Sequence, residues 1–262
     1  INDILAIDSE AAVVGSRARV VTAPGGPDAE IRISKLNQGT NDYGGVVVYN
    51  QGEADTLTES SPAFEQVTLK PHKKTAMTYA SNEVLANAPG FSSFLSGLLR
   101  DAVVDACESD FISGNGVNKA QGIVSAPGSI QYDRAGAGAI AYADITGMMA
   151  RLLMRGATSP VWLASQSTLP QIAGIGDGTN NILVTNAAVG MPPTLMGIPI
   201  IYNSRLAALG SQGDLILADL GKYLIANGSG PSLMVSEHAR FTTDESAIRL
   251  TFRVDGQLWL DS

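Results

Sequence analysis

The sequence predicts an α+β fold, because it holds one long helical pattern and several separate strand patterns. Over residues 90–113, apolar side chains recur every three or four residues, as on the buried face of a helix. Over residues 248–254, apolar and polar side chains alternate strictly, as on a strand that is buried on one side. The chain has 262 residues, of which 45% are hydrophobic, so it can bury a substantial core.

Residues 1–35 are expected to form an extended N-terminal arm. Short β-branched runs, such as Val13-Val14 and Val20-Val21, lie on either side of small and polar residues, and a Pro-Gly-Gly-Pro loop follows at 24–27. This segment is too thin to enclose a core of its own, so we expect it to run along other elements.

Residues 36–69 are expected to form an extended loop built as a two-stranded ribbon. The strand-like runs at 46–49 and 64–69 flank a polar stretch, which puts the tip at residues 50–62. An isolated two-stranded ribbon is only marginally stable in water. The ribbon therefore needs to pack against its own domain or against a neighbouring subunit.

The charge pattern of this ribbon favours the neighbouring subunit. Five acidic residues and no Lys or Arg lie between Leu36 and Leu69, and a basic cluster follows directly. We hypothesise that Glu53, Asp55 and Glu59 contact basic residues of an adjacent copy. A solvated acidic loop without such contacts is the alternative. The candidate basic residues are Lys70, Lys73, Lys74 and Arg100.

The helix predicted over residues 90–113 is long for a chain of this size. Pro89 suits a first helical turn, and Gly114-Asn115-Gly116 ends the pattern. At about 1.5 Å per residue the helix extends roughly 35 Å. Cys107 borders its apolar stripe and is expected to be a small buried hydrophobic side chain.

The middle of the chain predicts a second, smaller group of elements. A helix is expected from Asp144, as its cap residue, to Gly156, followed by a buried strand at 161–163 and a short helix at 167–172. Residues 174–181 have the Gly-rich, polar composition of an exposed loop. The residues of interest in that loop are Gly174, Gly176, Asp177 and Gly178.

The last third of the chain predicts a sheet. Asp255-Gly256 is expected to form a turn that leads to a further short strand at 257–260. The other strand patterns lie at 215–217, 223–225, 233–235 and 248–254.

Composition disfavours several classes of function. The formal net charge is -8, from 25 acidic and 17 basic residues, which disfavours tight nucleic-acid or membrane-surface binding. One cysteine excludes an intramolecular disulfide, and with only two histidines we expect no zinc site. Neither a P-loop nor a Gly-x-Ser-x-Gly motif is present, so we expect no enzyme and no cofactor. A start at Ile1 fits either a protease-generated end or a shortened sequence.

Several segments, taken in order, resemble one known family. The first set lies at 52–54, 60–64 and 67–71, the second at 81–88 with the helix and Gly114-Asn115-Gly116, and the third at 121–123, 193–200, 213–214 and 219–223. Together they resemble the major capsid proteins of tailed bacteriophages with the Hong Kong-type fold, which encapsulin shells share. Nearly the whole chain is covered by this resemblance.

The resemblance implies a division into arm, loop, peripheral domain and axial domain. The arm is 1–35, the extended loop 36–69, the peripheral domain with its spine helix 70–119, the axial domain 120–231, and strands that return to the peripheral domain 232–262. The loop at 174–181 would then lie at the symmetry axes of rings of subunits.

The resemblance also implies a function. The chain would self-assemble into pentamers and hexamers of an icosahedral virion shell, built in the host bacterial cytoplasm around phage double-stranded DNA without sequence-specific contacts. A portal, a scaffold or maturation protease and decoration proteins are further partners of such shells, and no membrane is involved. An encapsulin-type nanocompartment is the alternative. A soluble α+β enzyme with an unrecognised site is a third interpretation.

Overall fold

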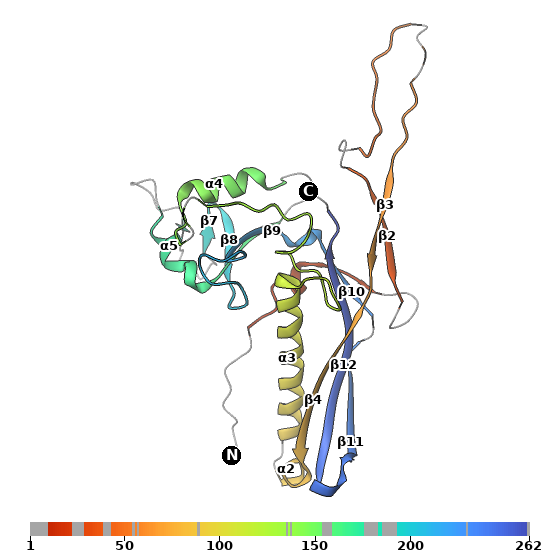
Figure 1. Ribbon diagram of the computed structural model, residues 1–262, viewed down its shortest axis with the longest axis vertical. Helices are drawn as coiled ribbons and strands as arrows, with labels where there is room; N and C mark the ends of the chain where they lie inside the picture. Colours follow the sequence, from red (N-terminus) through yellow and green to blue (C-terminus); the bar gives the residue numbers. More distant parts are fainter. Residues whose placement is uncertain are drawn as a thin grey trace.

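A computed structural model describes residues 10–22, 29–38, 43–53, 56, 58–87, 90–134, 136, 138–153, 159–175, 183–184, 193–228 and 230–260. These residues form an elongated unit, a compact unit beside its upper end, and a ribbon that projects away from both (Figure 1). The fold is therefore mixed helix and sheet, as the sequence predicts.

The elongated unit is a long helix on one face of a narrow sheet. Helix α3 (Phe91–Ser113) lies along strands β4 (His72–Ser81) and β12 (Glu245–Leu258). The α3 side chains Leu95 and Leu99 are buried against Ile248 and Leu250 of β12. The helix therefore lies where its apolar repeat predicts. The other edge of β12 pairs with β10 (Tyr223–Asn227) and β11 (Ser232–Arg240).

The turn predicted at Asp255-Gly256 is wrong, because strand β12 continues through both residues to Leu258. Both residues stay in the ladder, where Gly256 is the partner of Ile225. The Asp255 carboxylate accepts the backbone N–H groups of Lys70 (2.7 Å) and Gly256 (2.8 Å), and burial raises the pKa of Asp255. A Cβ on Gly256 would lie 2.8 Å from Cε1 of Tyr223, so the glycine serves close packing rather than a turn.

The compact unit has a mixed sheet in the order β6-β7-β8-β5-β9, with helices α4 (Tyr142–Arg151) and α5 (Leu169–Ala173) packed on it. Helix α4 begins two residues before Asp144, so Asp144 is not the cap residue. Its carboxylate instead reaches back to accept the N–H of Ala141 at 2.8 Å. The strands are β5 (Pro160–Ala164), β6 (Leu183–Val184), β7 (Thr194–Leu195), β8 (Ile198–Tyr202) and β9 (Leu215–Asp219).

The projecting ribbon pairs β2 (Ile31–Leu36) with β3 (Phe64–Leu69), and the loop 37–63 continues beyond it (Figure 1). The prediction of a strand at 46–49 is wrong, since the described residues of that loop form no strand. The backbone N–H of Val47 donates instead to Oγ of Ser60 at 3.1 Å. The first strand of the ribbon thus comes from the segment that we expected to be an arm.

Residues 10–22 of that segment are packed against the elongated unit. The short helix α1 (Val14–Arg17) buries Val13 and Val14 in a core shared with Phe111 of α3. Strand β1 (Arg19–Thr22) then adds to β10 in parallel. The remaining short elements are α2 (Asn82–Asn87), η1 (Gln166–Thr168), η2 (Leu220–Lys222) and η3 (Phe241–Thr243).

Replacing each of two glycines of the elongated unit by alanine is expected to change the free energy of unfolding in opposite directions. A Cβ on Gly122 would lie 2.5 Å from the N atom of Gly114 and 2.6 Å from the carbonyl O of Ile112, and these backbone atoms cannot rotate away. We expect Gly122→Ala to lower the free energy of unfolding by about 3 kcal/mol, the upper end for overpacking. Gly97 lies inside α3, and a Cβ added there would meet no atom within 4 Å, so Gly97→Ala should stabilise by about 0.5–1 kcal/mol. Chemical denaturation of both variants measures the difference, and equal effects would contradict it.

Candidate assembly interface

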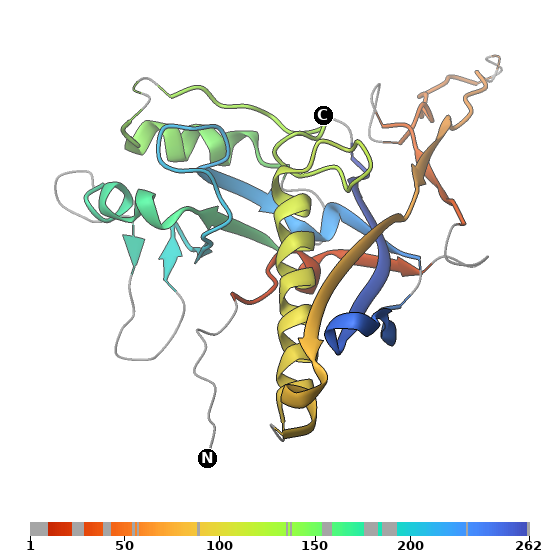
Figure 2. The same cartoon turned by 60° about the horizontal axis from the view of Figure 1, so that its bottom comes forward.

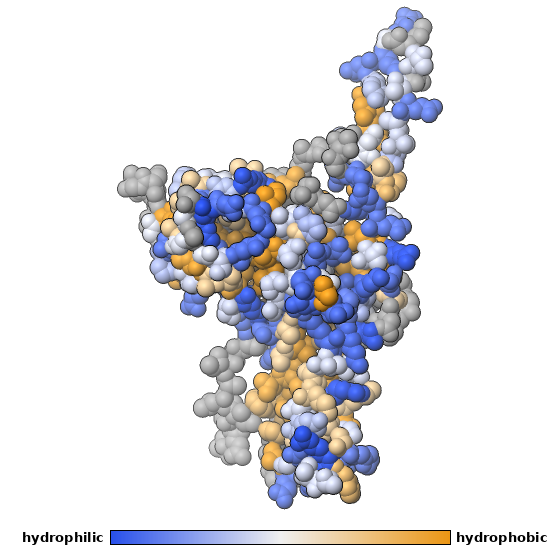
Figure 3. Space-filling model, in the orientation of Figure 1, coloured by the Kyte–Doolittle hydropathy of each residue, from blue (hydrophilic) through white to orange (hydrophobic). Residues whose placement is uncertain are grey.

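Two of the three acidic residues singled out on the loop are described, and both are exposed. Glu53 and Glu59 are exposed on the loop 37–63, and Asp55 lies outside the described residues. Figure 3 shows this loop standing free of the two units, with polar and apolar side chains mixed on its surface. Their position leaves both described carboxylates available to another molecule.

The loop also exposes a cluster of large apolar side chains. Tyr43 is 74% exposed and Val48 is 90% exposed, which is unusual for side chains of this size. Val46, Val47 and Tyr49 are exposed beside them. We call this set the apolar loop patch. No described part of the chain's own core covers it.

The four basic candidates are not equivalent. Lys70 forms an ion pair with Glu30 at 2.7 Å and lowers the pKa of that carboxyl group. Lys74 pairs with Asp110 of α3 at 2.5 Å and donates to the Ala106 carbonyl at 2.9 Å. Both lysines are thus already used within their own chain.

Lys73 and Arg100 are exposed and form no ion pair with a described residue. They lie on different sides of the elongated unit. Lys74 points towards α3, so its neighbour Lys73 points away from the helix, because successive strand side chains alternate. Arg100 is on α3 itself. The two residues therefore cannot form one patch.

The pairing of β4 with β12 places further basic residues on the same face of the sheet as Lys73. Lys73 is opposite Arg253, and Met77 is opposite Arg249, so all four point away from α3. Arg240 lies 4.0 Å above the ring of Tyr79 on the same face. We call this surface, on the side of β4, β12 and β11 that is opposite α3, the outer sheet face. It also exposes three large apolar side chains, which are Met77, Tyr79 and Met234.

The sequence analysis missed Arg249 as an interface candidate, whereas Arg240 pairs with Glu245 of its own chain at 2.9 Å. The strict alternation at 248–254 does show Arg249 and Arg253 on one side of a strand. What it lacks is the pairing of β12 with β4, which brings residues about 180 positions apart onto one face.

The loop expected at the symmetry axes is only partly described. Gly174 ends helix α5 and donates its N–H to the carbonyl of Gln171 at 3.1 Å. Gly176, Asp177 and Gly178 lie outside the described residues. The placement of this loop at an axis stays a prediction.

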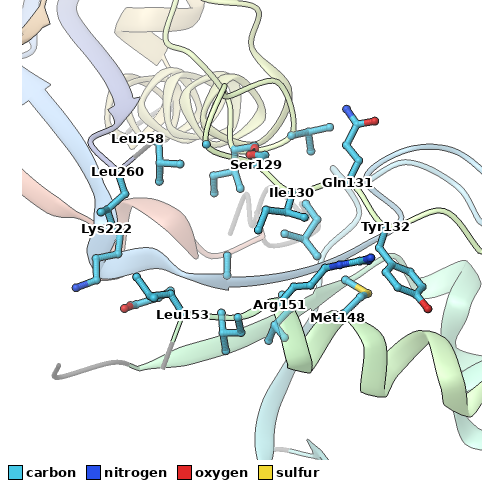
Figure 4. Close-up of a pocket in the computed structure, with 18 of the residues that line it drawn as sticks. Ser129, Ile130, Gln131, Tyr132, Met148, Arg151, Leu153, Lys222, Leu258 and Leu260 are labelled. Atoms are coloured by element: carbon cyan, nitrogen blue, oxygen red, sulfur yellow. The ribbon is translucent and has the colours of Figure 1, made fainter. Parts of the chain in front are cut away.

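A groove of about 1470 Å³ lies between the compact unit and the end of β12 (Figure 4). Its walls are mostly apolar, and Leu153, Ile130 and Leu258 point into it. Two arginines in the walls have partners in the chain: Arg134 pairs with Asp214, and Arg151 lies 4.5 Å above the ring of Tyr132. These contacts hold the walls together.

Other classes of site leave little trace in the part of the chain that the structure describes. Among those residues, no group of three or more His, Cys, Asp or Glu side chains is arranged to hold a metal ion. No described helix is both long enough and apolar enough to cross a bilayer. Cys107 is buried, and desolvation raises the pKa of its thiol to about 11.

Comparison with known proteins bears on both sequence and fold. The model of the Phage capsid family matches residues 2–262. No protein with a curated description matches the sequence. The fold resembles the capsid of the native GTA particle computed with C5 symmetry, with a TM-score of 0.79 and 17% identity over 98% of this chain and 89% of that one.

Two phage structures have the same fold at similar distance. A chain of Microbacterium phage Oxtober96 has a TM-score of 0.71 and 14% identity over 100% of this chain and 89% of the other. A chain of Mycobacterium phage Bobi has a TM-score of 0.69 and 14% identity over the same shares. At such low identity these likenesses establish the fold. The family match extends over nearly the whole sequence, and the protein therefore belongs to the phage capsid family and is a capsid shell protein.

Proposed function

We propose that the chain assembles into pentamers and hexamers of an icosahedral virion shell that encloses double-stranded DNA. Nothing in the family or its structural neighbours points to catalysis. The proposal is supported by the five-fold symmetry of the GTA capsid with the same fold. Assembly would take place in the host bacterial cytoplasm, and the net charge of -8 would limit adhesion of the DNA to the shell.

The projecting ribbon is the observation that carries the proposal. The ribbon projects from the two units (Figure 1), and its loop exposes the apolar loop patch. Exposed apolar patches of this kind mark protein–protein contacts. A closed shell offers every copy of the ribbon an equivalent neighbour, and this explains how such a ribbon is stabilised.

We propose that the ribbon docks on the outer sheet face of the neighbouring copy. The loop carries Glu53 and Glu59 beside Tyr43 and Val48, and the outer sheet face offers Lys73 and Arg249 beside exposed methionines. The two surfaces are thus complementary in both charge and hydrophobicity. Lys70 and Lys74, which have internal partners, leave the set of proposed contacts, and so does Arg100.

The magnitudes indicate how affinity and orientation are divided. An exposed ion pair contributes about 0–1 kcal/mol. Burying a Val side chain contributes about 1.5–3 kcal/mol. The apolar loop patch should therefore supply most of the affinity, while the charges select the orientation and exclude wrong partners.

Reversing the loop charges should impair assembly without unfolding the subunit. In Glu53→Lys/Asp55→Lys/Glu59→Lys, we expect particle yield to fall at least tenfold at low salt, where charges are least screened, while circular dichroism stays unchanged. The matched control Glu83→Lys/Asp101→Lys/Asp133→Lys makes the same change in net charge at exposed acids outside the loop. Normal yield from the loop variant, or equal loss from the control, contradicts docking by charge.

Negative-stain electron microscopy after size-exclusion chromatography tests the function itself. Closed shells with nuclease-protected DNA, purified from infected cells, are the expected result. Closed shells that hold a protein cargo instead of DNA would favour a nanocompartment. A persistent monomer under all assembly conditions would overturn the proposal.

A further inference from the structure

Helix α3 contains a buried carboxylate, Glu108, which the packing of the helix on the sheet does not require. Glu108 is 1% exposed, deep in the core between the two units. Burying a carboxylate costs several kcal/mol, by order of magnitude, unless hydrogen bonds replace its water. An apolar residue would fill this position at lower cost, so the carboxylate must gain something specific.

The gain is a set of three backbone hydrogen bonds to the start of α1. Val13 and Val14 donate their N–H groups to Oε2 at 3.1 and 2.9 Å, and Gly15 donates to Oε1 at 2.7 Å. These are N–H groups at the start of a helix, which have no partner inside it. A Cβ on Gly15 would lie 2.8 Å from Oε1, so glycine permits this approach.

The same short segment is also held by the compact unit. Glu10 accepts hydrogen bonds from the backbone N–H and the hydroxyl of Ser204, at 3.1 and 2.6 Å. Ser204 lies two residues beyond the end of strand β8. We call residues 10–15 the strap. One end is bound to the compact unit and the other to α3.

Arg205 joins the two attachments. Its side chain is 6% exposed, and its Nε donates to Asp105 of α3 at 2.6 Å. Its Nη2 donates to the backbone carbonyl of Glu10 at 3.1 Å. One guanidinium from the compact unit therefore binds both the helix and the strap. Figure 2 shows the N-terminal segment, in red, passing α3 between the compact unit and the sheet.

Apolar packing acts together with these polar contacts. Val13 and Val14 lie in one apolar cluster with Phe111 of α3. The same cluster contains Leu206 of the compact unit and Leu220, which directly follows β9. The strap thus fills the junction as well as bridging it. Movement of the compact unit about α3 would break the polar contacts and expose this cluster.

We propose that the strap is a conformational latch that fixes the angle between the compact unit and α3. Glu108 holds the latch closed by accepting the N–H groups of residues 13–15. This inference rests on the proposed function, because the angle matters most in a shell. There it sets the curvature that each subunit contributes, and thereby the diameter of the particle. Release of the strap lets the compact unit rotate, and one sequence then forms shells of several sizes.

The test is Glu108→Gln in the full chain. A glutamine side chain has one acceptor oxygen and an amino group that cannot accept, so at least one of the three N–H groups loses its partner. We expect hydrogen exchange at residues 13–15 to accelerate by roughly tenfold or more. Exchange in β5 and β12 should stay at the wild-type rate, and particle diameters should spread. Asp101→Asn, an exposed acid on the same helix, is the control and should change neither quantity.

Faster exchange throughout the chain would show that Glu108 only stabilises the fold, and would overturn the latch. So would released residues 13–15 with an unchanged distribution of diameters. If Glu108→Gln does not fold, Glu10→Ala/Ser204→Ala removes the side-chain contacts at the exposed end of the strap and leaves the Arg205 bond to the backbone carbonyl of residue 10. Its particles should vary in diameter at unchanged thermal stability, and uniform particles would refute the proposal. If the wild type forms no shells, the proposed function fails, while the exchange data still decide whether the strap is a latch.

Discussion

The double variant Lys73→Glu/Arg249→Glu is expected to form no particles, although its subunits still fold. Both side chains are on the outer sheet face, and both are exposed. In the proposed contact the double change places two acids opposite Glu53 and Glu59 of the loop, so attraction would become repulsion. Each contact changes by only about 1–2 kcal/mol, but every copy in the shell repeats it. We expect no particles by electron microscopy and a subunit with unchanged circular dichroism.

The charge swap gives this prediction its control. Combining Lys73→Glu/Arg249→Glu with Glu53→Lys/Glu59→Lys restores opposite charges across the contact, and particles should return. Arg19→Glu/Arg100→Glu makes the same change in net charge at exposed residues of β1 and α3, and should assemble normally. Loss of assembly with Arg19→Glu/Arg100→Glu, together with normal assembly of Lys73→Glu/Arg249→Glu, would place the contact away from the outer sheet face.

Trp162→Ala is expected to cause the largest loss of subunit stability. The ring is fully buried in the compact unit among Ile172 and Ile200, and its Nε1 donates to the carbonyl of Leu195 at 3.2 Å. Truncation leaves a cavity and removes the hydrogen bond of Nε1, so the free energy of unfolding should fall by about 3–5 kcal/mol. Urea denaturation of the isolated subunit measures this.

Phe241 provides the matched aromatic control for that measurement. Phe241 is 80% exposed in η3, the short turn that connects β11 to β12. Phe241→Ala should change the free energy of unfolding by less than about 0.5 kcal/mol. A loss below about 1 kcal/mol for Trp162→Ala would mean that the compact unit relaxes around the cavity.

Predictions that rest on patterns among neighbouring residues were confirmed. The apolar repeat at 90–113 gave the long helix within one residue, and the alternation at 248–254 gave a half-buried strand. Cys107 is buried, as its place at the border of the stripe predicts. The family resemblance is confirmed by the match over residues 2–262. These predictions succeed because the period of a helix or strand is written in adjacent positions.

Turn and cap predictions were less reliable. Asp255-Gly256 has the composition of a hairpin turn, yet β10 pairs with both residues and keeps β12 extended. Asp144 caps from inside the first turn rather than ahead of it. In both places a tertiary or medium-range contact outweighed a local preference whose energy is small.

The sequence by itself determined the fold class, the long helix, the family and the acidic, lysine-free character of the loop. Only the tertiary structure decided which charges are available, by pairing Lys74 with Asp110 and by grouping Lys73 with Arg249. It alone showed that Glu108 binds the chain 95 residues upstream. The physical reason is that periodicity depends on neighbours along the chain, whereas ion pairs, sheet faces and buried carboxylates depend on residues that only folding brings together.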